Sequence, residues 1–132
     1  MEEQQYSWKR FDNIHARLED RITVTKNGAI GFPTRFYQDN NIKDYKYIVL
    51  YYDEAQKAIG IHFTNDENEK SKFSILHSKQ NYGGSAVVRS FFKVSRIDPK
   101  IYYGRYDFTV RQEPELGTLY VFQLKERVDP KA

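Results

Sequence analysis

One stretch of the chain, residues 22–61, constrains the fold more than any other. It reads ITVTKNGAIGFPTRFYQDNNIKDYKYIVLYYDEAQKAIGI, with short alternating runs on both sides of Asn27-Gly28, then Pro33, a run at helical spacing and an apolar hairpin. Alternation is typical of half-buried strands, and Asn-Gly between two such runs favours a type I′ turn. The stretch therefore predicts one strand–turn–strand–helix–hairpin unit.

The composition agrees with a β-rich domain, because aromatic residues reach 16% and include eleven Tyr and nine Phe. The 132 residues fit a single domain, 1–132. The absence of cysteine excludes disulfides, cysteine zinc sites and thiol catalysis. The sequence has neither the apolar run of a membrane span nor that of a signal peptide. We therefore expect a soluble, cytoplasmic protein without a membrane partner.

The second half of the chain repeats the order of elements in the first. An isoleucine follows the first aromatic residue of each helical run by six residues, Ile42 after Phe36 and Ile97 after Phe91. This pattern predicts two tandem repeats, residues 22–63 and 72–124, joined by the charged loop 64–71. In the second repeat we expect strands over 72–77, 86–88, 105–110 and 118–124, a tight turn at Gly83-Gly84 and a helical turn over 89–95. Within the strand 105–110, alternation places Tyr106, Phe108 and Val110 on one face.

The N-terminal extension, residues 1–20, has two possible conformations. Ser7 is placed to cap a helix, and Trp8, Phe11, Ile14 and Leu18 follow at helical spacing. Alternatively, residues 11–18 lie extended against a sheet edge. The sequence leaves both open.

The segment Gly28-Ala29-Ile30-Gly31-Phe32-Pro33 resembles the pattern of the AbrB/SpoVT-type swapped-hairpin barrels, which is a glycine, two hydrophobic strand positions and a proline. The family's isoleucine nine residues after the proline corresponds to Ile42, and its aspartate in the following hairpin turn to Asp53. The two halves together are similar in layout to tandem MraZ-like proteins. The resemblance implies a mainly β fold with short helices, a swapped-hairpin-like β-barrel, and duplex DNA binding as in transcriptional regulators and antitoxins.

At the family's arginine positions this chain has Ala29, Gly84, Tyr37 and Gln38. The candidate DNA contacts are therefore the basic residues nearest the two glycine turns: Arg21, Lys26, Arg35, Lys79, Arg89, Lys93 and Arg96. If both turns lie on one face, these residues would form a patch for phosphates. The alternative is an ordinary solvated surface, since the net charge is only +3.

Two other binding functions fit the sequence. An apolar patch that includes Trp8 and Phe11 would suit a protein-interaction or scaffolding module. A tyrosine face would suit a single-stranded nucleic-acid binder, although core packing explains most of these tyrosines. The face would comprise Tyr45, Tyr47, Tyr51, Tyr52, Tyr102, Tyr103 and Tyr106.

No catalytic motif is recognisable, so the sequence predicts a non-enzymatic protein without a cofactor, acting as a monomer or homodimer. The three histidines, His15, His62 and His77, lie far apart in the sequence and do not predict a metal site. The loop residues Asn65, Glu67 and Glu69 alternate like calcium ligands but lack the EF-hand glycine and final glutamate. We interpret that loop as solvated.

Overall fold

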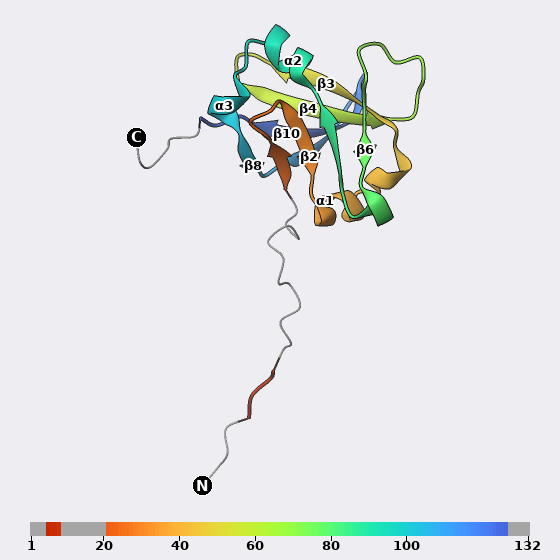
Figure 1. The fold of residues 1–132 in the computed structure, drawn as a ribbon, viewed down its shortest axis with the longest axis vertical. Helices are drawn as coiled ribbons and strands as arrows, with labels where there is room; N and C mark the ends of the chain where they lie inside the picture. The colour runs from red at the N-terminus through yellow and green to blue at the C-terminus, as the bar shows by residue number, and fades with distance from the viewer. Residues whose placement is uncertain (1–4, 9–20, 127–132) are drawn as a thin grey trace.

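The computed structural model describes residues 5–8 and 21–126, and the strands in these ranges form two antiparallel sheets (Figure 1). Sheet A has the order β6 (Leu76–His77), β7 (Gly84–Val87), β2 (Ala29–Phe32), β1 (Ile22–Val24) and β8 (Gly104–Tyr106). Sheet B has the order β5 (Phe73–Ser74), β3 (Tyr47–Asp53), β4 (Ala58–Thr64), β10 (Gly117–Gln123) and β9 (Thr109–Glu113).

Short helices connect the strands. The α-helices are α1 (Thr34–Asp39), α2 (Arg89–Val94) and α3 (Pro99–Tyr102), and the 3₁₀ helices are η1 (Ile42–Asp44) and η2 (Lys79–Asn81). A mainly β fold with short helices is thus confirmed. None of the helices in the described ranges is long and apolar enough to cross a membrane.

Two segments of chain contribute a strand to each sheet. Only Ile75 separates β5 in sheet B from β6 in sheet A, and only Asp107 and Phe108 separate β8 in sheet A from β9 in sheet B. The single strands expected over 72–77 and 105–110 are therefore wrong, because each segment bends from one sheet to the other. Neither sheet closes on itself.

The core lies between the two sheets, and each of the two bends lies at or next to a residue buried in that core. Ile75 is buried, and its N–H donates to the Lys46 carbonyl at 2.9 Å. Tyr106 is also buried, whereas Val110, expected on the same face, is 50% exposed. The step between β8 and β9 removes Val110 from the alternation. The most deeply buried side chains are aromatic and β-branched, including Phe32, Phe36, Tyr37, Phe92, Phe122, Ile22, Ile30, Ile48, Ile59 and Ile61.

The first hairpin turn differs from the expected type I′ geometry. The Gly28 N–H donates to the Thr25 carbonyl at 3.1 Å, so Lys26 and Asn27 are the central residues of the turn. Neither of these has a positive φ, whereas Gly28 has φ +87°. This is the three-residue pattern in which a glycine after the turn adopts the left-handed conformation. The prediction of a hairpin is confirmed, but the predicted turn type is wrong.

The second expected turn is also built differently. Gly84 is the first residue of β7, and the connection from β6 contains η2 instead of a tight turn at Gly83-Gly84. Gln80 and Asn81, not the glycines, hold the positive φ angles, at 62° and 58°. The Ser78 hydroxyl accepts from the Gly83 N–H at 2.9 Å and closes this connection.

Corresponding elements of the two halves end in the same way. In each half one residue separates the strand from the helix, β2 from α1 and β7 from α2. A left-handed residue then follows each helix, Asn41 with φ 54° and Arg96 with φ 57°, and a buried isoleucine comes next, Ile42 or Ile97. Left-handed residues commonly end helices because the chain can reverse there. The N-terminal extension, for which the sequence allows a helix or an extended segment, lies largely outside the described residues, and residues 6–8 are in no helix or strand.

Candidate nucleic-acid interface

A shallow depression of about 390 Å³ lies between the first hairpin turn and the helices of the second half. We call it the basic depression, because four of its side chains are cationic. It is lined by Lys26, Asn27, Gly28, Arg89, Phe92, Lys93, Ile97, Asp98, Pro99 and Lys100. Residues far apart in the sequence thus present positive charge at one place.

The turn and the start of α2 are held together by one backbone hydrogen bond and one side-chain hydrogen bond. The Val88 N–H donates to the Gly28 carbonyl at 2.9 Å, and Arg89 Nε donates to the Asn27 carbonyl at 2.9 Å. A Cβ on Gly28 would lie only 2.8 Å from Cγ of Arg89. Glycine is therefore required here by both its φ angle and its closeness to Arg89. The Arg89 side chain is held at Cγ by packing against Gly28 and at Nε by the hydrogen bond to Asn27.

Lys26 and Asp98 of the basic depression are also held by their neighbours. Lys26 Nζ lies 4.4 Å from the centre of the Tyr103 ring, a cation–π contact. The carboxylate of Asp98, the single acid in the lining, accepts from the Lys100 N–H at 2.9 Å and caps α3. The surplus of positive charge is what a phosphate backbone would bind.

The structure brings three of the seven predicted contacts together, Lys26, Arg89 and Lys93. The two glycine turns precede β2 and β7, which pair antiparallel, so the turns lie at opposite ends of these strands; Figure 1 likewise shows α1 and α2 at opposite ends. Arg35 on α1 pairs with Asp39 at 3.4 Å, and Lys79 is exposed on η2. Arg96 is exposed after α2, outside the lining of the depression.

Sequence reasoning missed Lys100. The signal that could have found it is Asp98-Pro99, because an aspartate before a proline is typical of the start of a helix. The proline is the first residue of α3, and the helix places Lys100 in the basic depression.

A second, larger hollow of about 700 Å³ lies over sheet A, and we call it the sheet A groove. It contains Arg21, the last predicted contact, and Arg105, which sequence reasoning missed. Arg21 Nε also pairs with Asp107 at 3.3 Å. The lining comprises Arg21, Thr23, Phe32, Pro33, Thr34, Leu76, His77, Ser78, Tyr82, Gly83, Gly84, Ser85 and Arg105.

Comparison with known proteins found no matching family model, no curated relative and no similar solved structure.

The tyrosines considered as a stacking face do not form one platform. Tyr45 packs against Phe63 and Tyr52 against Phe91, at ring-centre distances of 5.8 and 6.2 Å. Tyr106 is buried, and its hydroxyl donates to the Lys125 carbonyl at 3.0 Å. Core packing thus accounts for these three residues, as the sequence analysis favoured.

Tyr37, which the resemblance noted in the sequence places at an arginine position, points into the core. Its side chain is only 1% exposed, and burial raises the pKa of its phenol, helped by the negative charge of Asp44. Its hydroxyl meets Nδ1 of His77 at 2.6 Å. His62 makes a separate contact, from Nδ1 to the Thr118 carbonyl at 3.0 Å. Both histidines therefore take part in ordinary structural hydrogen bonds within the sheets.

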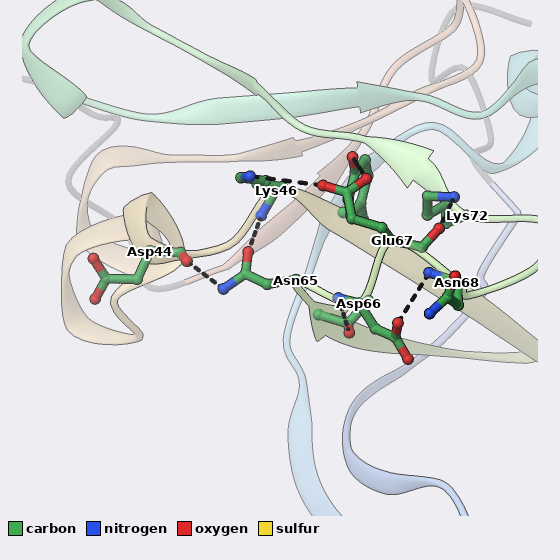
Figure 2. Close-up of polar contacts among 9 residues, drawn as sticks. Asp44, Lys46, Asn65, Asp66, Glu67, Asn68 and Lys72 are labelled. Atoms are coloured by element: carbon green, nitrogen blue, oxygen red, sulfur yellow. Dashed lines mark hydrogen bonds and ion pairs between the residues drawn. The ribbon is translucent and has the colours of Figure 1, made fainter.

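The charged loop after β4 is ordered by its own polar groups (Figure 2). The Asn65 amide accepts from the Lys46 N–H and donates to the Asp44 carbonyl, both at 2.8 Å. Glu67 accepts from the Tyr47 hydroxyl at 2.6 Å and lies 3.6 Å from Lys46 Nζ. The tyrosine hydrogen bond lowers the pKa of Glu67 and raises that of Tyr47. Within the described ranges, no three His, Asp or Glu side chains gather as a metal site would require.

Proposed function

We propose that this chain is a small non-catalytic protein that binds duplex DNA through the basic depression. The observation that carries the proposal is the convergence of Lys26, Arg89, Lys93 and Lys100 around the Gly28 turn. Phosphate contacts, many of them from Lys and Arg, position a protein on DNA, and a rigid frame fixes where those cations lie. The contacts of Arg89 with Asn27 and of Lys26 with Tyr103 provide that frame. A regulatory or antitoxin role and the cytoplasmic location expected from the sequence are part of this proposal.

We also propose that the fold is a divergent swapped-hairpin barrel made of two tandem repeats. Three features support this. Equivalent strands pair antiparallel, β2 with β7 and β4 with β10. The strand–helix spacing and the left-handed residue after the helix are the same in both halves. The two segments that pass between the sheets link the halves into one ring of paired strands, although each sheet is open.

Salt-dependent binding to a fluorescent duplex tests the DNA proposal. Wild-type protein should bind more weakly as salt increases, with about 0.9 lost from the log–log slope for each phosphate contact removed. The triple variant Lys26→Gln, Lys93→Gln, Lys100→Gln should therefore lower the slope by about 3. The control variant, Lys43→Gln, Lys70→Gln, Lys125→Gln, removes the same charge from exposed positions outside the depression and should retain the wild-type slope. Equal losses in both triple variants would refute a localised site.

The second candidate is a protein-interaction module on the same fold. The burial of Tyr37 favours it, because the position that carries a DNA-reading arginine in the similar family serves the core here. The exposed Val94 on α2, at 83%, offers an apolar contact beside the depression. A stoichiometric protein partner, together with no DNA binding at about 50 mM salt, would decide for this function.

A further inference from the structure

We propose that the sheet A groove binds an elongated organic anion, with a carboxylate head at Arg21 and Arg105 and an apolar body that reaches Leu76 and Tyr82. This site is distinct from the basic depression and does not depend on the proposed function. Its volume of about 700 Å³ is within the range of small-molecule sites, about 300–1,000 Å³.

The floor of the groove is a row of small side chains across sheet A. Successive cross-strand partners are Arg105 with Thr23, Thr23 with Gly31, Gly31 with Ser85, and Ser85 with Leu76. The three central residues are small, and the two end residues are large. A Cβ on Gly31 would meet its nearest neighbour, Cβ of Thr23, at an ordinary 3.5 Å. Gly31 is therefore not required by the backbone, and its missing side chain deepens the hollow.

The charge of the groove selects an anion. Arg21 and Arg105 carry the positive charge of its lining, and Asp107, which lies outside the lining, offsets part of that charge. Asp107 holds Arg21 Nε at 3.3 Å, which orients that guanidinium. An arginine fork matches a carboxylate with two parallel hydrogen bonds, so the β1–β8 end fits a carboxylate head.

The opposite end of the groove selects an apolar body. Leu76 is 60% exposed and Tyr82 is 58% exposed, and both line the same hollow. Large apolar side chains that converge on a concave site are typical of ligand contacts, whereas isolated exposed ones are not. A hydrocarbon or aromatic group placed there would remove apolar surface from water on both sides.

The length of the ligand follows from the sheet. Arg105 and Leu76 are four strand positions apart, and neighbouring strands lie about 4.8 Å apart, which gives a span of about 19 Å. The arginine side chains cover part of that distance. A head and tail joined by a short chain, as in 6-phenylhexanoate, therefore fit better than a compact anion.

Titration of ¹⁵N-labelled full-length protein with 6-phenylhexanoate, followed by two-dimensional NMR, tests this site. Saturable shifts should appear at the amides of Thr23, Leu76 and Ser85. The matched neutral probe, 6-phenylhexanamide, should bind about tenfold more weakly, because it lacks the charge-assisted hydrogen bonds. Equal affinity for the two probes, or shifts distributed outside the groove, would overturn the proposal.

Two variants test separately the end of the groove that binds the carboxylate and the floor of the groove. Arg105→Gln should weaken carboxylate binding about tenfold and leave amide binding unchanged. Gly31→Val should fill the floor and weaken both probes, while its NMR spectrum confirms that it is folded. Lys43→Gln, an exposed change on η1, serves as the control and should bind both probes like wild type. If duplex DNA, and not the anion, shifts the groove amides, the groove belongs to the DNA interface and this proposal fails.

Discussion

The hydroxyl of Tyr37 lies 2.6 Å from Nδ1 of His77, and this contact ties α1 to β6 across the two halves of the chain. The other ring nitrogen, Nε2, lies 2.8 Å from the Tyr45 carbonyl. A carbonyl only accepts hydrogen bonds, so Nε2 carries a proton. In the neutral ring Nδ1 is then the acceptor, and Tyr37 donates to it.

This arrangement predicts the tautomer of His77. Long-range ¹H–¹⁵N NMR at mildly alkaline pH should show the Nε2–H form, with Nδ1 unprotonated. Tyr37→Phe should lower the free energy of unfolding by about 1 kcal/mol, because Nδ1 loses its donor. Tyr45→Phe is the control, since it keeps the backbone carbonyl and should leave the tautomer unchanged. A ring protonated on Nδ1 alone would contradict the geometry.

Gly28→Ala should destabilise the protein, because the position has φ +87° and a Cβ would lie 2.8 Å from Arg89. We expect a loss of about 1–2 kcal/mol from the backbone conformation alone. The displaced Arg89 should also weaken DNA binding. Gly31→Ala is the matched control, with an ordinary 3.5 Å contact and no positive φ, and should change stability little. Chemical denaturation of both variants measures the difference.

Glu67 should contribute to the decline of the stability of the fold at acid pH. Its pKa is lowered, first by the hydrogen bond from Tyr47 and also by Lys46 and Lys72. A lowered carboxyl pKa adds stability that is fully present above the unfolded-state pKa and is lost as the pH falls through the folded-state pKa. Glu67→Gln should therefore flatten the decline of unfolding free energy at acid pH.

Two further variants check that assignment. Tyr47→Phe removes the hydrogen bond that contributes most to the shift and should flatten the same part of the pH profile. Glu115→Gln, in the exposed β9–β10 turn, should follow the wild-type profile. An unchanged acid slope in Glu67→Gln would show that the contact in Figure 2 does not act on stability.

The two halves should respond unequally to loss of the first aromatic residue in each helix. Phe36 is fully buried and contacts the rings of Phe108 and Tyr120 at centre distances of 4.9 and 5.5 Å. Phe36→Ala should cost about 3–5 kcal/mol because it leaves a cavity. Phe91, the corresponding residue, is only partly buried, so Phe91→Ala should cost about 1–2 kcal/mol. Equal losses, measured by urea unfolding, would contradict the burial difference.

Local patterns in the sequence predicted those elements that local rules control. The helical run after Pro33 is followed by Asn40-Asn41, and Asn41 adopts the left-handed conformation that asparagine tolerates after a helix. Alternation and turn residues also predicted the hairpin from β3 to β4, in which Asp53 accepts from the Gln56 N–H at 3.2 Å.

Features set by contacts between distant residues were not predictable in this way. The bends at Ile75 and at Asp107-Phe108 depend on packing between the sheets, and neither bend contains a glycine or a proline. The basic depression was predicted in part, because Lys26 and Arg89 lie beside sequence signals. Their closeness depends on the contact of Gly28 with α2, which joins residues about sixty positions apart. The sheet A groove does not follow from local sequence patterns, since five strands from both halves of the chain build it.

The segments 73–77 and 104–113 have a mechanical consequence. Because each one is a continuous piece of chain hydrogen-bonded into both sheets, separating the sheets would break strand pairing at two places at once. Neither sheet can therefore detach from the other with all of its own strand pairing intact. Force applied to one sheet is transmitted through covalent bonds to the other, so the domain should yield in a single cooperative event.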